Sequence, residues 1–348
     1  MSTGHRSAVL VDTPQAPPTT PRVLVVMYHY VRDVDALPRP GAPGPYEGIK
    51  GLTTSQFSAQ LDQLCSTLEP IDWPTFFAGM NGAADLPERS FLLTFDDGLA
   101  DHAETVLPIL EGRGLRGVFF VSGAVLTEHR MLPAHAIHLL LSALGDEPLE
   151  RELCNHLSAR TDYAELTAPL KDDAIAPRSA STMYHYEAPR RARLKYWLTM
   201  QLPIDVRNEA VDALFERHIG AGSRWARHWY LGWADLVRMQ SSGHTIGGHG
   251  FSHEPLARLS DDDVRRDVTH VARVLREGLG ADYRPFSYPY GSHPEAAADA
   301  CRDRGFAHAF TTEPRWIEPS TDKLLLPRVD AVNVEMFLRR LVPQEVHA

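Results

Sequence analysis

Two adjacent carboxylates, Asp96 and Asp97, stand at the end of an apolar run. The stretch from Phe91 to Gly98 reads Phe-Leu-Leu-Thr-Phe-Asp-Asp-Gly. An apolar run of strand length that ends abruptly in charge is typical of a buried strand emerging into a polar site. Two neighbouring like charges repel one another unless a positive group lies beside them. The alternative is an ordinary turn, because Asp-Gly is a common turn dipeptide.

A histidine pair offers a possible partner for these carboxylates. His249 and His253 lie four residues apart, after the run His244 to Gly248. On a helical turn this spacing puts both imidazoles on one face, where they can hold one cation. With a strand-end carboxylate they would form a His-His-Asp set that leaves coordination open for water and substrate. The alternative is a pair of solvated loop histidines, because the chain holds 17 histidines.

A third candidate segment is Pro285 to Gly291, which reads Pro-Phe-Ser-Tyr-Pro-Tyr-Gly. It begins as a short apolar stretch and ends in a turn. Its Pro-Tyr-Gly turn can present a backbone N–H to a developing oxyanion. A tight turn with only a structural role is the competing interpretation.

These residues need a scaffold that brings strand ends together. Apolar runs predict strands near residues 23–30, 68–72, 91–98, 117–121, 244–248, 285–288, 307–311 and 324–328. Helical patterns between them include one capped at Thr53 and others over 101–112, 229–241, 261–278 and 294–304. Alternation of strands and helices indicates parallel βα units. The count favours an α/β fold, a distorted TIM-like (β/α)7-8 barrel. An open doubly wound sheet is the competing architecture, but no Gly-x-Gly-x-x-Gly or P-loop pattern supports it.

The alternation stops between residues 124 and 227, where the patterns are mostly helical. We therefore expect a barrel formed by residues 23–123 and 228–340, with a helical insertion over its active-site face. Such an insertion can act as a lid or a specificity wall. Residues 1–22 are expected to form a flexible tail.

Composition narrows the class of protein. The 348 residues are 43% hydrophobic and 23% charged, as in an ordinary globular protein. A formal net charge of −10 argues against a nucleic-acid partner. Three cysteines far apart predict no disulfide framework. We find no apolar run long enough to span a membrane and no signal-peptide core, so we expect a cytoplasmic protein. The oligomeric state leaves no trace in the sequence.

Three segments in chain order resemble the motifs of the polysaccharide deacetylase family (NodB-homology, carbohydrate esterase): Thr94–Gly98, His249-x-x-x-His253 and Tyr288–Gly291. The opening Met27–Val31 is also similar to the start of bacterial members. The resemblance covers residues from about 23 to 334. It implies a distorted (β/α) barrel and the metal-dependent removal of N-acetyl groups from amino sugars.

The resemblance also implies roles for individual residues. Asp97, His249 and His253 would hold the metal. Asp96 would be the general base that deprotonates the attacking water, and the backbone of Tyr290 would help to bind the oxyanion. Two histidines and one carboxylate suit zinc best, and cobalt, nickel or iron can occupy the same ligands.

The chain departs from the family pattern at two positions close to the expected base and acid. Ser287 stands where many members have an arginine that braces the base, and Arg328 stands on a last strand without the usual histidine. We hypothesise that Arg328 braces Asp96 by charge-assisted hydrogen bonds, a surface ion pair being the alternative. The proton donor would be His29 or a water on the metal, unless His29 is a packed histidine beneath the site.

Two aromatic residues, Trp316 and Tyr288, are expected to contact the substrate. Trp316 corresponds to the family's pocket tryptophan, although its accompanying aspartate is missing. Three further tryptophans (Trp225, Trp229 and Trp233) could narrow an open groove into a pocket, although at this spacing they suit a helix core.

The predicted function is therefore that of a metal-dependent hydrolase. It would remove an N-acetyl or related N-acyl group from an amino sugar or a sugar-containing precursor. A catalytically impaired carbohydrate-binding relative is one alternative. A hydrolase of another C–N bond, such as a formamide or a cyclic amide, is the other.

Overall fold

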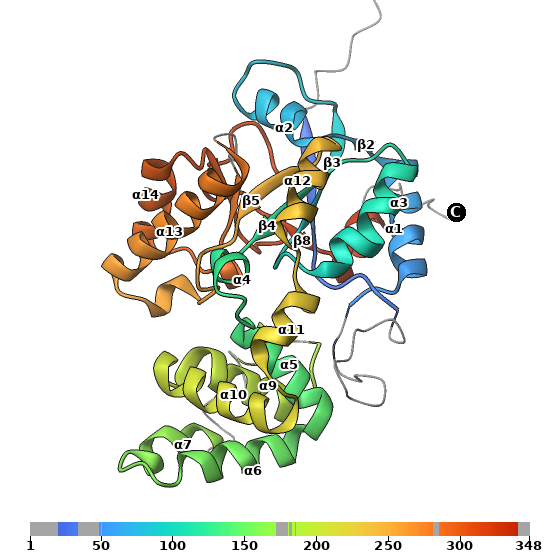
Figure 1. Cartoon of the computed structure of the whole chain (residues 1–348). Coiled ribbons are helices and arrows are strands. Elements are labelled where there is room, and N and C mark those ends of the chain that lie inside the picture. Colours follow the sequence, from blue (N-terminus) through green and yellow to red (C-terminus); the bar gives the residue numbers. More distant parts are fainter. Residues whose placement is uncertain are drawn as a thin grey trace, which may run out of the picture.

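A curled sheet of parallel strands forms the centre of the molecule (Figure 1). The computed structural model describes residues 20–33, 49, 51–171, 180, 183–184, 186–280 and 285–339. All but the last three residues of the predicted tail therefore lie outside the described ranges. The strand order is β7-β6-β5-β4-β3-β1-β8, and β2 pairs with β3. The strands are β1 (Arg22–Tyr28), β2 (Glu69–Pro70), β3 (Arg89–Phe95), β4 (Gly117–Val121), β5 (Thr245–Gly248), β6 (Pro285–Ser287), β7 (His308–Phe310) and β8 (Val329–Asp330).

The two longest strands, β1 and β3, pair in parallel along their whole length. The register begins with Arg22 opposite Arg89 and ends with Tyr28 opposite Phe95. Apart from their first residues, both strands are buried throughout, as their continuous apolar sequences require. Because the strands end at the same level, the residues that follow them emerge side by side at the carboxyl edge of the sheet.

The sheet curls so far that its edges nearly meet. An isolated parallel bridge joins Phe310 at the end of β7 to Leu326, and β8 pairs with β1 on the other side. This is the distorted barrel that the sequence predicts. The eighth strand was expected over 324–328, however, and that boundary is wrong. Pro327 has no backbone N–H to donate, and the N–H of Arg328 donates to the Glu313 carbonyl at 3.1 Å. Regular pairing therefore begins only at Val329.

Helices cover the outside of the sheet, with α13 and α14 on one side and α1 and α3 on the other (Figure 1). The Thr53 side chain and Gln56 form a capping box at the start of the first helix, as the Thr-rich sequence suggests. The helices are α1 (Thr54–Thr67), α2 (Trp73–Met80), α3 (Leu107–Gly112), α12 (Trp233–Ser241), α13 (Asp261–Leu279), α14 (Glu295–Arg304) and α15 (Val334–Arg339). Within the described ranges, no helix has both the length and the apolar character needed to cross a bilayer.

A second group of helices lies at one end of the sheet (Figure 1). In the described part of residues 123–229, every regular element is a helix. The elements are α4 (Gly123–Thr127), α5 (Pro133–Leu144), α6 (Asp146–Leu157), α7 (Tyr163–Lys171), α9 (Pro189–Tyr196), the π-helix η3 (Trp197–Gln201), α10 (Ile204–His218) and α11 (Gly222–Trp229). We call α5 to α11 the helical lobe. Trp225 and Trp229 are each 1% exposed and form part of its core, so neither can stack on a sugar.

The helical lobe is attached to the turn that follows β3. A helix was expected over residues 229–241, but α11 ends at Trp229 and α12 begins only at Trp233. Tyr230 between them is extended and bridges Leu99. The next residue, Leu231, donates its N–H to the Gly98 carbonyl at 2.8 Å. The lobe therefore lies against the carboxyl ends of the strands.

Candidate active site

The candidate site residues gather at the carboxyl edge of the sheet. All but Arg328 follow or end a strand, so parallel pairing brings these residues to one side. The set comprises His29 after β1, Asp96 and Asp97 after β3, His249 and His253 after β5, Ser287 at the end of β6, and Arg328 before β8. The structure thus brings together the residues for which sequence analysis expected a metal site and a base.

Asp96 is bound by a buried arginine. Arg328 Nη1 donates to Asp96 Oδ1 and Arg328 Nη2 donates to Asp96 Oδ2, both at 2.7 Å. Ser287 Oγ adds a third bond, to Oδ2 at 3.2 Å. Arg328 is 0% exposed and Asp96 is 2% exposed. The contact expected from the sequence is therefore present, and it is a buried bidentate pair rather than a surface ion pair.

The guanidinium of Arg328 is itself held from several directions. Nε donates to the Thr311 carbonyl at 3.1 Å, and Nη1 also donates to Thr94 Oγ1 at 3.2 Å. Nη2 also donates to Ser287 Oγ at 2.8 Å. Ser287 thus bridges the arginine and the aspartate at the position where the family pattern has an arginine. Burial alone would raise the pKa of Asp96, but the charges of Arg328 and His249 and the hydrogen bonds from Arg328 together lower the pKa to about 2.

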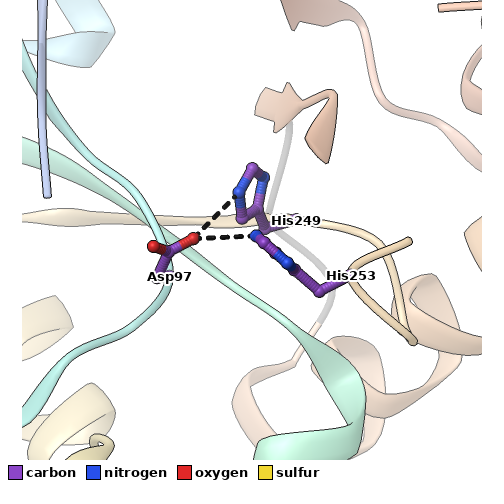
Figure 2. Close-up of side chains that lie close together, drawn as sticks. All are labelled: Asp97, His249 and His253. Carbon is purple, nitrogen blue, oxygen red and sulfur yellow. Dashed lines mark hydrogen bonds and ion pairs between the residues drawn. The ribbon is translucent and has the colours of Figure 1, made fainter. Parts of the chain in front are cut away.

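Asp97 lies among imidazoles instead. Figure 2 shows one of its oxygens between two rings: Oδ1 is 2.9 Å from His253 Nε2 and 3.3 Å from His249 Nε2. Its other oxygen, Oδ2, lies 3.1 Å from His135 Nε2. Burial opposes ionisation of Asp97, but the charge of His253 and hydrogen bonds from the three rings hold its pKa well below the usual range. All four residues are at most 6% exposed.

The donor set of Asp97, His249 and His253 fits a divalent cation. His249 Nδ1 lies 2.8 Å from the Ser287 carbonyl and must donate to it, so the Nε2 of a neutral ring carries a lone pair. That lone pair faces a carboxylate oxygen, which is unfavourable unless a cation or a proton lies between them. Ligands about 2.0 Å from a tetrahedral zinc ion are about 3.3 Å apart, close to the distances seen here. The three ligand atoms all lie within 4.8 Å of one another.

A buried aspartate of α13 shapes the loop that carries both histidines. Asp267 accepts the N–H of Phe251 at 2.7 Å, the N–H of Ser252 at 2.8 Å and the Ser252 hydroxyl at 2.6 Å. Gly250 has a φ of +67°, and a Cβ there would lie only 2.9 Å from Asp267 Oδ1. The tight loop therefore requires both this carboxylate and a glycine.

Backbone strain is concentrated in the site. Asp97, His253 and Tyr290 have φ values of 76°, 58° and 57°. In the described part of the chain, His129 is the only other non-glycine residue with positive φ. Such conformations cost about 1–3 kcal/mol each and persist only where the surroundings impose them. The Tyr290 ring lies 5.2 Å from the ring of His253, which places the Pro-Tyr-Gly turn beside the donor set.

His29 is held at the end of β1 by its backbone. Its carbonyl accepts a hydrogen bond from His102 Nε2 at 2.9 Å, and two residues later the N–H of Val31 donates to Asp101 Oδ2 at 2.8 Å. The imidazole is half-buried and close enough to Asp96 to lower the pKa of that carboxyl. His29 is therefore not a fully buried core histidine.

Two predicted substrate contacts are not brought to the site. Tyr288 is 0% exposed, and its hydroxyl donates to the Leu324 carbonyl at 3.0 Å behind the sheet. Trp316 precedes Ile317, whose backbone pairs with Val23 at the amino-terminal end of β1. Side chains alternate between the two faces of a strand. Because Ser287 points toward the site, its neighbour Tyr288 points away from the site.

With the geometry established, comparison with known proteins identifies the family. The family model described as "Polysaccharide deacetylase" matches residues 83–168 and 208–309, more than half of the chain. The chain therefore belongs to the polysaccharide deacetylase family. The first match extends through α5 and α6, which sequence analysis placed in the insertion outside the usual core, and residues 169–207 fall between the two matches.

Solved structures share the fold. IcaB from Ammonifex degensii is 16% identical, with a TM-score of 0.54 over 92% of this chain and 97% of that chain. The Streptococcus pyogenes deacetylase PplD, in complex with acetate, is 12% identical, with a TM-score of 0.55 over 93% of this chain and 100% of that chain. A de-N-acetylase from Aggregatibacter actinomycetemcomitans is 15% identical, with a TM-score of 0.54 over 92% and 100%. These similarities show that this chain shares its overall fold with the solved structures over nearly its whole length.

Proposed function

We propose that this chain is a metal-dependent amidohydrolase that removes N-acetyl groups from amino sugars. Family membership supports an amide-hydrolysing enzyme. The observation that carries the proposal is that the two adjacent carboxylates have different partners. Asp96 has a permanent cation of its own, Arg328, whereas Asp97 faces two imidazole nitrogens at ligand spacing. The two neighbouring carboxylates can then both stay ionised, one as a base and the other as a metal ligand.

Asp97, His249 and His253 would hold the cation. When bound there, a divalent cation supplies Lewis acidity, which polarises an amide carbonyl and lowers the pKa of water. Of the metals that accept two histidines and a carboxylate, we propose zinc.

Asp96 would accept the proton of the attacking water. Its carboxylate is fully ionised at neutral pH, because the pKa is about 2. The same arginine makes it a weak base, so Arg328 fixes the position of the base at the expense of its basicity. Proton transfer is most efficient when donor and acceptor have similar pKa values. Asp96 therefore depends on the cation site beside it to acidify the water.

The remaining steps fall to Tyr290 and His29. The strained peptide of Tyr290 lies beside His253, where its N–H would support negative charge on the amide oxygen. His29 is close enough to Asp96 to act on its charge, and it would donate the proton that the departing amine needs. The products are acetate and a free amino sugar.

Acetate release is the direct test. The purified protein should be assayed with short N-acetylglucosamine oligomers and with the monosaccharide, as isolated, after chelation and after the return of zinc. We expect zinc-dependent release from the oligomers, as the deacetylase neighbours suggest. Zinc-loaded protein that binds oligomers without releasing acetate would instead be a carbohydrate-binding relative. Formate release from N-formyl substrates alone would indicate another C–N hydrolase.

A further inference from the structure

The second oxygen of Asp97 has a partner from outside the barrel. Whereas Oδ1 faces the two ligand histidines, Oδ2 lies 3.1 Å from Nε2 of His135. His135 belongs to α5, in the helical lobe, and is 1% exposed. Neither the motif pattern nor the proposed mechanism assigns this histidine a role.

The hydrogen bonds around His135 show which atom is the donor in its contact with Asp97. The backbone N–H of Leu132 donates to the Tyr230 hydroxyl oxygen at 2.9 Å. His135 Nδ1 lies 2.6 Å from the same hydroxyl. The ionised carboxylate of Asp97 can only accept, so the single N–H of a neutral His135 is on Nε2, and Nδ1 accepts the tyrosine proton. The chain of bonds therefore ends with a donor on Oδ2 of the carboxylate.

Both ends of this chain of bonds are fixed to the turn that carries Asp97. The backbone of Tyr230 bridges Leu99, and Leu231 donates its N–H to the Gly98 carbonyl at 2.8 Å. Tyr230 is 5% exposed, so solvent does not compete for its hydroxyl. Because α5 and the turn after β3 are tied together here, His135 cannot move away without breaking several buried contacts.

We propose that His135, oriented by Tyr230, is a positioning residue that restrains Asp97 to bind the cation through Oδ1 alone. The inference rests on the proposed metal site and assigns a role within it to the helical lobe. A hydrogen bond to the non-ligating oxygen fixes the carboxylate's rotation and discourages it from binding through both oxygens. The lobe thus completes the metal site instead of only covering it.

A role for His135 as a fourth ligand does not agree with the geometry. In the described chain, the atoms close enough to share a cation are those of Asp97, His249 and His253. The His135 ring centroid lies 6.3 Å from that of His253, and its Nε2 faces the oxygen turned away from the cation position. Its Nδ1 is already engaged by Tyr230.

Zinc affinity tests the proposal without relying on activity. Affinity would be measured by competition with a chromophoric chelator for the full-length protein and for His135→Leu, His135→Gln and Tyr230→Phe. Outer partners of metal ligands typically contribute 10–100-fold to affinity, so we expect His135→Leu to bind zinc about 10–100-fold more weakly. His135→Gln retains an N–H donor and should recover part of this loss. Tyr230→Phe leaves His135 in place without orienting it and should weaken binding about threefold to tenfold.

His138→Leu is the matched control, because His138 lies one turn further along α5 and contacts Tyr30 rather than Asp97. Its zinc affinity should equal that of the wild type. The visible spectrum of the cobalt-loaded protein adds a second readout. Loss of the restraint in His135→Leu should change the coordination number and hence the spectrum, whereas His138→Leu should not alter it.

The outcomes separate this inference from the proposed function. A wild-type protein that binds no zinc, or that binds it equally well after His253→Ala, contradicts the metal site itself. Zinc binding lost in His253→Ala but unchanged in both His135→Leu and Tyr230→Phe overturns the positioning role alone. If His135→Leu does not fold, Tyr230→Phe with wild-type affinity and an unchanged cobalt spectrum still overturns it.

Discussion

Asp96 and Asp97 are neighbours in the chain, yet the two pockets around them are built differently. The pocket of Asp96 comes from the barrel alone: Thr94 on β3, Ser287 on β6 and Arg328 before β8. The pocket of Asp97 combines the loop after β5 with His135 of the helical lobe. The first supplies a permanent positive charge, and the second supplies imidazoles that can be neutral.

This difference explains how one dipeptide can hold two functions. A guanidinium does not lose its proton in a protein, so Arg328 neutralises Asp96 at every pH at which Asp96 is ionised. Neutral imidazoles leave the charge of Asp97 open to an external cation. We infer that the arginine prevents Asp96 from competing for the metal.

The largest effect is expected from removing a ligand in the Asp97 pocket. In His253→Ala we expect bound zinc to be lost and acetate release to fall by at least about a thousandfold. Lewis acidity contributes several kcal/mol, and each 1.4 kcal/mol is a factor of ten. Metal analysis and the acetate assay check this. The exposed His228 of α11 provides a control, and His253→Ala with full zinc content would contradict the ligand assignment.

The Asp96 pocket is tested by Arg328→Met. A buried carboxylate left without its partner costs about 3–5 kcal/mol of unfolding free energy, and we expect turnover to fall about a hundredfold from misplacement of the base. Bound zinc should remain. The exposed Arg315 is the control, because its removal should change stability little.

The pH dependence of this stability has a definite sign. Asp96 has a pKa lowered from 3.8 to about 2 in the folded protein. The pair therefore stabilises the fold above about pH 4, and this contribution is lost as the pH falls toward 2. The difference in unfolding free energy between the wild type and Arg328→Met should shrink across that window. A constant difference in urea unfolding from pH 7 to pH 2 would contradict the assignment.

The His29→Ala variant tests whether His29, near Asp96, is the general acid that protonates the departing amine. We expect His29→Ala to keep its zinc and its turnover to fall about a hundredfold. This is the lower end of the rate enhancement that general acid catalysis typically contributes. Its pH–rate profile should change as well, because the proton donor is gone. Unchanged turnover and an unchanged profile would instead assign proton donation to water.

The smallest effect is expected from Asp267, which shapes the loop of the two ligand histidines. An asparagine there replaces one accepting oxygen by an N–H₂ group facing backbone donors. Asp267→Asn should lose about 1–3 kcal/mol of stability and bind zinc about tenfold more weakly. Turnover at saturating zinc should stay close to that of the wild type. Asp262→Asn on the exposed face of α13 is the control.

Much of the barrel side could be predicted from the sequence. Continuous apolar runs that end in Asp96 or His29 locate both the strands and their functional ends, since parallel strands place those ends together. The last strand was misplaced because Pro327 interrupts a run that otherwise reads as a strand. Tyr288 was assigned to the wrong face because a three-residue strand gives little pattern from which to read the alternation of sides.

The lobe side could not be predicted in the same way. His135 lies in an apolar helix and reads as a core residue, and its contact with Asp97 spans 38 positions without a motif. Tyr230 was expected inside a helix, where its hydroxyl would have had no reason to reach α5. Asp267 left a weak signal, a carboxylate on the apolar side of an amphipathic helix. Such contacts depend on tertiary packing, which local patterns do not encode.

Paired asparagine variants test most directly whether Asp96 is the base and Asp97 the metal ligand. Asp96→Asn and Asp97→Asn would each be measured for zinc per chain and for acetate release. We predict that Asp96→Asn keeps one zinc per chain and loses nearly all turnover, whereas Asp97→Asn loses the zinc together with the turnover. Loss of zinc in Asp96→Asn, or near wild-type turnover in that variant with zinc bound, would contradict the assignment of base and ligand.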